Sequence, residues 1–169
     1  ALELGCEHND IDACASMGDT YRMGHGVSMD IPKAKAFFQK ACELGKGEID
    51  ACTEYAEAIL LGKDKESEHS GMRVLERACS GNVASASSYL GLCYTEGLHV
   101  VPYNPGSWRL GVRYYEQSCT LGRAASCHRV CSLYRAGHGV AKNAALANQA
   151  CKRGCQLGDT DACEELKKP

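Results

Sequence analysis

Twelve cysteines supply most of the reactive side chains of this chain, and their spacing is regular. A first series follows steps of 36, 37, 40 and 36 residues: Cys6, Cys42, Cys79, Cys119 and Cys155. A second series runs in parallel: Cys14, Cys52, Cys127 and Cys163, with Ser87 where a further cysteine would fall. Near-constant steps of this kind indicate an internal repeat of 36 to 40 residues.

Disulfides, a zinc site and redox chemistry are the three uses that such cysteines could have. An even count, in a chain where 12 of 169 residues are cysteine, is typical of a disulfide framework formed in an oxidising compartment. Structural zinc sites usually contain a C-x2-C pair, and this sequence has none. A disulfide scaffold is therefore the leading interpretation, with zinc binding and redox catalysis as the weaker alternatives.

The sequence carries no recognisable catalytic motif. It has no G-x-S-x-G, H-E-x-x-H or S-x-x-K, and no phosphate-binding glycine-rich loop. His25 and His138 occupy equivalent Gly-His-Gly-Val turns three repeats apart, so they cannot share a metal ion. We expect no catalytic residue, no metal site and no cofactor.

Two helices in each repeat must position these cysteines. Apolar or small residues stand 0, 3, 4 and 7 places after a cysteine of the second series and a glycine stands 10 places after it, a pattern that predicts a first helix and its end. The periodicity predicts second helices over residues 31–44, 70–80, 107–121 and 143–157, and a short final helix over 160–168. Each repeat is then a helical hairpin that buries its apolar face against its neighbours.

The unit Leu-Gly-x-x-Tyr-x-x-Gly-x-Gly-Val, followed by Lys-Ala and Ala-Cys-x-x-Gly, resembles the Sel1-like repeat, a relative of the tetratricopeptide repeat. This resemblance implies an all-α, right-handed solenoid of αα-hairpins with inter-repeat disulfides, forming a single domain over residues 1–169. The predicted divisions are the end of a preceding repeat (1–10), repeats at 11–46, 47–83, 84–123 and 124–159, and a capping helix (160–169). Residues 97–108 form the longest connection, which we expect either to pack on the repeats or to bind a partner.

The repeat register predicts a disulfide at each of four junctions, because the end of one second helix meets the start of the next first helix there. The predicted pairs are Cys6 with Cys14, Cys42 with Cys52, Cys119 with Cys127, and Cys155 with Cys163. Cys79 faces Ser87 in this register and is predicted to be a thiol outside the disulfides.

The other cysteines leave alternatives open. Cys131 could pair with Cys151 in its own hairpin or with Cys93 on the preceding first helix. Cys127-x3-Cys131 and Cys151-x3-Cys155 could also form a twin C-x3-C hairpin, which competes with the junction pairing.

The resemblance also implies that the first helices line a concave groove that binds a partner. The residues expected to face it are Asp12, Asp19, Arg22, Asp50, Glu54, Glu57, Leu61, Tyr89, Leu92, Glu96, His128, Arg129 and Arg135. Their charges predict a groove that is acidic at its N-terminal end and basic at its C-terminal end, with Tyr89 and Leu92 as central apolar contacts.

Charge and hydropathy limit the partners. The net charge of −2 gives no basic field that would attract nucleic acid. The sequence also has no run of 18 apolar residues that could insert into a membrane. With its cysteines, the chain is similar to the Helicobacter cysteine-rich proteins, which are secreted or periplasmic, and to a mitochondrial intermembrane-space factor for cytochrome oxidase assembly.

We therefore expect a monomeric, non-enzymatic scaffold that binds a protein or peptide in the bacterial periplasm or outside the cell. The alternatives are a thiol-active or cofactor-binding assembly factor of the mitochondrial intermembrane space, and a β-lactam or cell-wall-binding protein. The missing S-x-x-K motif weakens the last of these.

Overall fold

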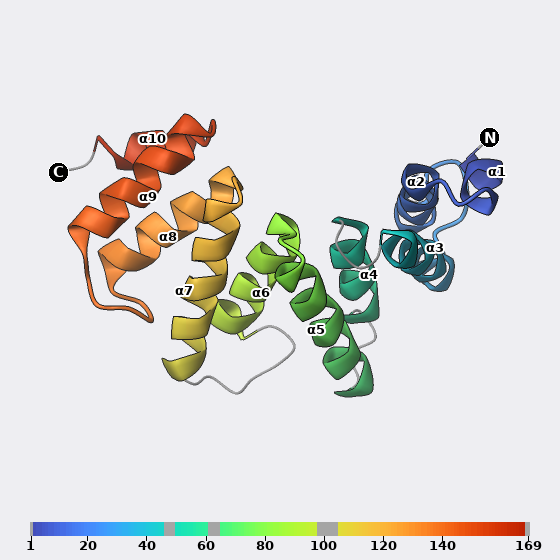
Figure 1. Ribbon diagram of the computed structural model, residues 1–169, viewed down its shortest axis with the longest axis horizontal. Coiled ribbons are helices and arrows are strands. Elements are labelled where there is room, and N and C mark those ends of the chain that lie inside the picture. The colour runs from blue at the N-terminus through green and yellow to red at the C-terminus, as the bar shows by residue number, and fades with distance from the viewer. Residues whose placement is uncertain (1, 46–49, 61–64, 98–104, 168–169) are drawn as a thin grey trace. The chain divides into compact units, whose positions relative to one another are not determined.

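The computed structural model describes residues 2–45, 50–60, 65–97 and 105–167, and the regular elements in these ranges are all α-helices. The chain divides into two compact units, Ala1–Gly81 and Asn82–Pro169. Helices α1 to α5 belong to the first unit and α6 to α10 to the second (Figure 1). Leu61 and residues 98–104 of the longest connection, both discussed above as binding candidates, lie outside the described residues.

The first unit is built from two helical hairpins that follow a short helix. Its helices are α1 (Leu2–Glu7), α2 (Ile11–Met23), α3 (Ile31–Leu44), α4 (Asp50–Leu60) and α5 (Lys65–Ser80). Helices α2 and α3 form one hairpin, α4 and α5 form the next, and α3 packs against α4. The Asp30 carboxylate accepts the N–H of Lys33 at the start of α3, and Gly24, with φ of 72°, ends α2.

Small residues let the helices of the first unit approach closely. The Phe38 side chain is fully buried, and a Cβ atom on Gly18 would lie 2.5 Å from its ring. Ala34, Ala41 and Ala56 are also almost fully buried in this unit. The low aromatic content of the sequence therefore reflects a core in which one aromatic ring fills the space that a glycine leaves.

The second unit repeats this architecture. Its helices are α6 (Ala84–Glu96), α7 (Pro105–Thr120), α8 (Ala124–Ala136), α9 (Ala144–Gln156) and α10 (Thr160–Glu165). Helices α6 and α7 form one hairpin, α8 and α9 form another, and α10 packs on both α8 and α9. Gly91 lies against the buried Tyr115 ring, where a Cβ would be 2.8 Å away. This glycine and ring repeat the pairing of Gly18 with Phe38.

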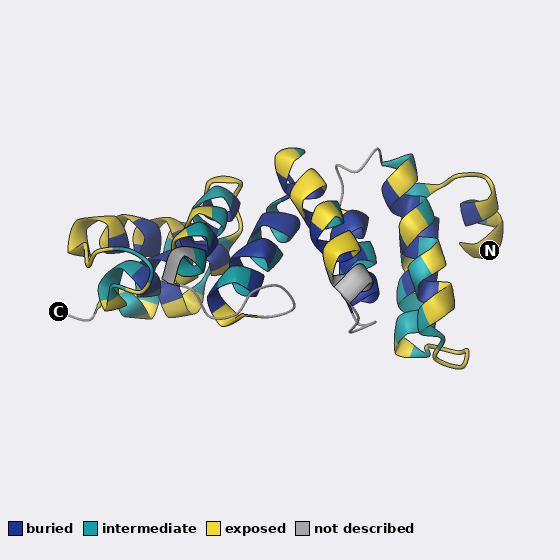
Figure 2. Ribbon diagram, turned by 90° about the horizontal axis from the view of Figure 1, so that it is seen from below, coloured by how far each residue is buried: buried dark blue, intermediate teal, exposed yellow. Residues whose placement is uncertain are grey.

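Burial follows the helical period in both units. In Figure 2 the dark blue positions alternate with teal or yellow ones along the helices, as expected for elements that bury one stripe. No helix among the described ranges is long and apolar enough to cross a membrane.

Helix boundaries differ from the sequence prediction by more than one residue at three places. Helix α5 begins at Lys65 instead of residue 70, because its first turns carry no apolar stripe that would reveal them. Helix α7 begins at Pro105, two residues early, since proline is favoured in a first helical turn. Helix α10 ends at Glu165, before the predicted residue 168.

Candidate functional site

Five disulfides hold the helices of the two units in place. Four of them join the end of a second helix to the start of the next first helix, each with a Cα–Cα distance of 4.6 Å: Cys6–Cys14, Cys42–Cys52, Cys119–Cys127 and Cys155–Cys163. These are the pairs that the junction register predicts. The fifth, Cys131–Cys151, ties α8 to α9 within one hairpin, with a Cα–Cα distance of 5.2 Å.

The fifth disulfide resolves the alternatives that the sequence left open. Cys131 bonds to Cys151 and not to Cys93, and Cys127 and Cys155 stay in their junction pairs, so a complete twin C-x3-C hairpin does not form. Cys79 and Cys93 lie outside the disulfides, and both thiols are buried. The boundary between the two compact units, after Gly81, falls at the repeat junction where Ser87 replaces a cysteine.

An acidic face covers part of α2 and α4 in the first unit. We define it by Asp19, Asp50, Glu54 and Glu57. The charges of Asp19, Glu54 and Glu57 act on Arg22, and the charge of Asp50 acts on Glu54. Arg22 forms an ion pair with Asp19, and its guanidinium carbon lies 5.7 Å from the centre of the Phe38 ring. Its Nε atom is buried and has no hydrogen-bond partner among the described residues. One arginine thus stands beside three carboxylates, and the fourth lies near Glu54.

The charges of the acidic face are crowded. Burial is the main cause that raises the pKa of Glu54 above its usual value, and the nearby charges of Asp19 and Glu57 raise it further. The hydrogen bond to Asp19 raises the pKa of Arg22, so this arginine stays charged. The four carboxylates therefore repel one another in the unbound chain, and a positively charged group placed beside them would relieve that repulsion.

The corresponding face of the second unit, on α6, α8 and α10, is balanced in charge. Arg129 pairs with Glu96 of α6, and Arg135 pairs with Glu165 of α10. The prediction that this end of the groove is basic is therefore wrong for these two residues. It omitted Glu165, because the short final helix was assigned only a capping role and not the position of another first helix.

The predicted apolar contacts of this face are half-buried. Leu92 packs against the core that contains Val112, Val130 and Leu133, so its side chain is largely committed to the interior. Tyr89 is also of intermediate exposure. The structure therefore leaves Tyr89 as the better placed of the two for contact with a partner.

A shallow hollow between α7, α8 and α9 is a feature that sequence reasoning missed. It has a volume of about 280 Å³ and is lined by Glu116, Tyr134, Leu146 and Arg153, among others. The Tyr134 hydroxyl donates a hydrogen bond of 2.6 Å to Glu116, which raises the pKa of Tyr134 to about 12. Arg153 donates to the carbonyls of Cys119 and Thr120. The polar groups of Glu116, Tyr134 and Arg153 that line the hollow therefore already bond to one another or to the backbone.

Comparison with known proteins bears directly on these hairpins. A family model for the Sel1 repeat matches residues 11–46, 84–122 and 124–159, which is more than half of the chain. The chain belongs to the Sel1 repeat family. The match leaves out α4 and α5, whose sequence departs most from the repeat pattern, although the structure forms a hairpin there. Sel1 repeat proteins mediate protein–protein interactions, and the fold is consistent with such a scaffold.

Three known proteins are similar to this chain in sequence or in fold. The chain is 28% identical over 148 residues to cytochrome c oxidase assembly factor 7 of Xenopus tropicalis, covering 84% of this chain but only 63% of that protein. Helicobacter pylori cysteine rich protein B is 28% identical, with a TM-score of 0.62, over 82% of this chain and 96% of that structure. A protective antigen of uropathogenic Escherichia coli has a TM-score of 0.76 at 20% identity, over 98% of this chain and 34% of that structure.

Proposed function

We propose that this chain is a non-enzymatic, disulfide-stabilised scaffold that binds a protein or peptide through its first helices, with the acidic face of α2 and α4 contacting a basic segment of the partner. The observation that carries the proposal is the gathering of four carboxylates with the single arginine Arg22 on two adjacent repeats. Folding does not require this arrangement, because a surface with mixed charges would have less repulsion between its side chains. A basic partner would turn the repulsion into attraction.

The helices beneath the acidic face are held rigidly. The Cys6–Cys14 disulfide fixes the start of α2, and Cys42–Cys52 fixes the start of α4 on the end of α3. Lys40 also donates a hydrogen bond of 2.7 Å to the carbonyl of Cys6. A face that is already ordered loses little conformational entropy when a partner binds, which favours affinity.

The five disulfides also support the proposal that the protein works in an oxidising compartment. Such bonds persist in oxidising surroundings and are rare in a reducing cytosol. We propose the bacterial periplasm or the extracellular space, in line with the Helicobacter protein, and the mitochondrial intermembrane space as the alternative, in line with the Xenopus protein. The scaffold would act there as a monomer.

Neutralising two charges tests the acidic face. The double variant Glu54→Gln/Glu57→Gln is expected to bind lysine- and arginine-rich peptides roughly tenfold more weakly, because each lost surface attraction is worth up to about 1 kcal/mol. Fluorescence anisotropy measures the affinities, with glutamate-rich peptides as the reference. Glu76→Gln, an exposed change on the second helix α5, is the matched control and should leave the affinity unchanged.

A stability readout separates a binding role from a structural one. The raised pKa of Glu54 means that its ionised form disfavours the folded state, so its contribution to stability is lost as pH rises through that pKa. The variant should therefore be at least as stable as the wild type at neutral pH while binding more weakly. Unchanged peptide affinity in the double variant would refute the role of the acidic face.

The similarity to a cytochrome c oxidase assembly factor favours a second candidate, a thiol-active assembly factor. In that case Cys79 or Cys93 would react readily with a thiol reagent. Their exposures of 3% and 0% instead predict that both thiols of the native, oxidised chain react slowly and become fast only on unfolding. A thiol that reacts within seconds in the native protein would favour the assembly factor over the simple scaffold.

A further inference from the structure

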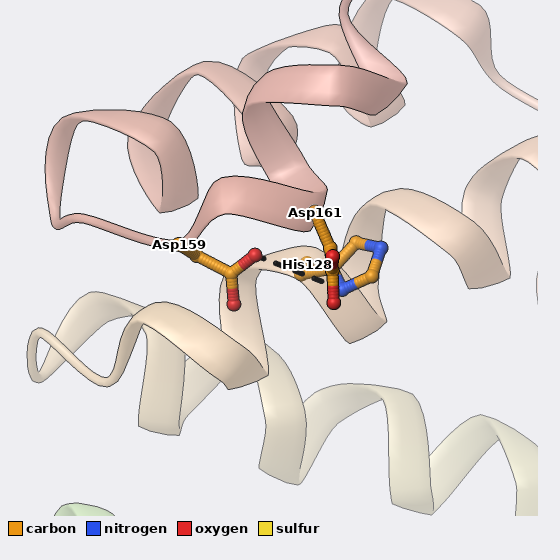
Figure 3. A group of neighbouring side chains, drawn as sticks. All are labelled: His128, Asp159 and Asp161. Carbon is orange, nitrogen blue, oxygen red and sulfur yellow. Dashed lines mark ion pairs between the residues drawn. The ribbon is translucent and has the colours of Figure 1, made fainter.

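Three side chains capable of binding a metal converge where α8 meets the start of α10. His128 lies on α8, Asp159 is the N-cap of α10, and Asp161 follows in its first turn (Figure 3). One ligand atom from each residue lies within 4.8 Å of the other two. The cluster combines an imidazole nitrogen with two carboxylates, and sequence reasoning missed it because His128 stands 31 or more positions before the two aspartates.

The spacing of these groups leaves room for an ion between them. Nδ1 of His128 is 3.9 Å from a carboxylate oxygen of Asp159, which is too far for a hydrogen bond. Ligands of a tetrahedral zinc ion with bonds of about 2.0–2.2 Å lie roughly 3.4 Å from one another. Asp161 is exposed, so a small rotation of its side chain can bring its oxygen to that distance.

Other contacts within the protein fix the position of the cluster before an ion binds. The Cys155–Cys163 disulfide fixes α10 on the end of α9, and the ion pair of Arg135 with Glu165 fixes it on α8. The Asp159 carboxylate also accepts the N–H of Ala162 at 2.7 Å, so its orientation is set by the helix cap. Ligands that are fixed by other contacts lose less freedom when an ion binds.

The repeat supplies a natural comparison inside the same chain. Asp10 and Asp12 precede Cys14 with the same Asp-x-Asp-Ala-Cys sequence that Asp159 and Asp161 form before Cys163. Asp10 is likewise the N-cap of its helix. Ala15 and Thr53 stand in the register of His128 in the first and second repeats, before junctions that carry Glu48 with Asp50 and Val83 with Ser85 in place of the aspartate pair. The acidic pair alone is therefore a capping feature, and the histidine distinguishes the last junction.

We propose that His128, Asp159 and Asp161 bind a divalent transition-metal ion such as Zn²⁺, which links α8 to α10. Imidazole favours zinc and its neighbours over the hard ions Mg²⁺ and Ca²⁺, which prefer sites made of oxygen ligands. Three protein ligands leave at least one coordination position to water or to a side chain of a partner. The ion would also cancel the two carboxylate charges at this end of the unit. This proposal is independent of the function proposed above.

Calorimetric titration of the oxidised full-length chain with Zn²⁺ tests the site. We expect one equivalent to bind with micromolar affinity, and His128→Gln or Asp161→Asn to weaken binding at least about tenfold. The double variant Asp10→Asn/Asp12→Asn is the matched control and should bind as the wild type does, because asparagine also caps helices. Circular dichroism confirms that each variant is folded.

Two further readouts make the result decisive. Zn²⁺ should raise the thermal midpoint of the wild type but not that of His128→Gln, since binding to the folded state alone is stabilising. Co²⁺ in place of Zn²⁺ should give a visible spectrum without thiolate charge-transfer bands, which excludes binding by Cys79 or Cys93. The absence of binding, or binding that His128→Gln does not weaken, would overturn the proposal.

Discussion

Replacing Cys131 and Cys151 together with alanine is expected to lower the free energy of unfolding of the second unit by about 3 kcal/mol. This disulfide closes a loop with a sequence separation of 20, the longest of the five. The chain-entropy model gives about 3 kcal/mol for a loop of that length, more than for the junction pairs with separations of 8 to 10. Both sulfur atoms are fully buried in the core of α7, α8 and α9, so their loss adds a packing cost.

Trp108 makes this effect measurable in the second unit alone. It is the single tryptophan of the chain and packs against the same core as Cys131 and Cys151. Denaturant unfolding followed by its fluorescence should therefore show the loss. Cys93→Ala, which removes a buried sulfur without breaking a disulfide, is the control for packing. A double variant no less stable than Cys93→Ala would show that this disulfide does not stabilise the hairpin.

Gly18→Val is expected to destabilise the first unit by about 2–3 kcal/mol. A Cβ at this position would lie 2.5 Å from two carbons of the Phe38 ring, which is fully buried and cannot swing into solvent. Overpacking of a core costs about 1–3 kcal/mol, and valine and glycine differ little in helix propensity. The predicted loss is therefore a packing effect.

Hydrogen exchange of peptides from α2 and α3 measures the change locally. Ser16→Val places the same side chain at an exposed position of the same helix and should leave exchange almost unchanged. Adding Phe38→Leu should recover part of the loss, because the smaller side chain makes room for valine. A fully additive double variant would contradict the direct contact between residues 18 and 38.

The repeat and its junction disulfides could be predicted from the sequence because they depend on spacing along the chain. Cysteines 8 or 10 residues apart across a tight turn have little choice of partner. The pairing of Cys131 could not be predicted in the same way, since two candidates stood at compatible positions on neighbouring helices. Only the packing of α8 against α9 brings Cys151 to it.

The surface was harder to predict than the core for a physical reason. Offsets along a helix indicate which side chains point outwards, but not which charges meet across helices. Arg135 therefore looked like a free basic group until α10 placed Glu165 beside it. The cluster of His128 with Asp159 and Asp161 was missed for the same reason, because its members come together only when the final helix docks.

Capture of partners under oxidising conditions tests the central claim that the first helices form a protein-binding face. Three baits are compared by quantitative mass spectrometry: the wild-type chain, the charge reversal Glu54→Lys/Glu57→Lys, and Glu76→Lys on α5. We predict that the wild type and Glu76→Lys retain the same protein, and that the charge reversal on α4 loses it while remaining folded. Equal retention of that protein by all three baits would contradict the claim.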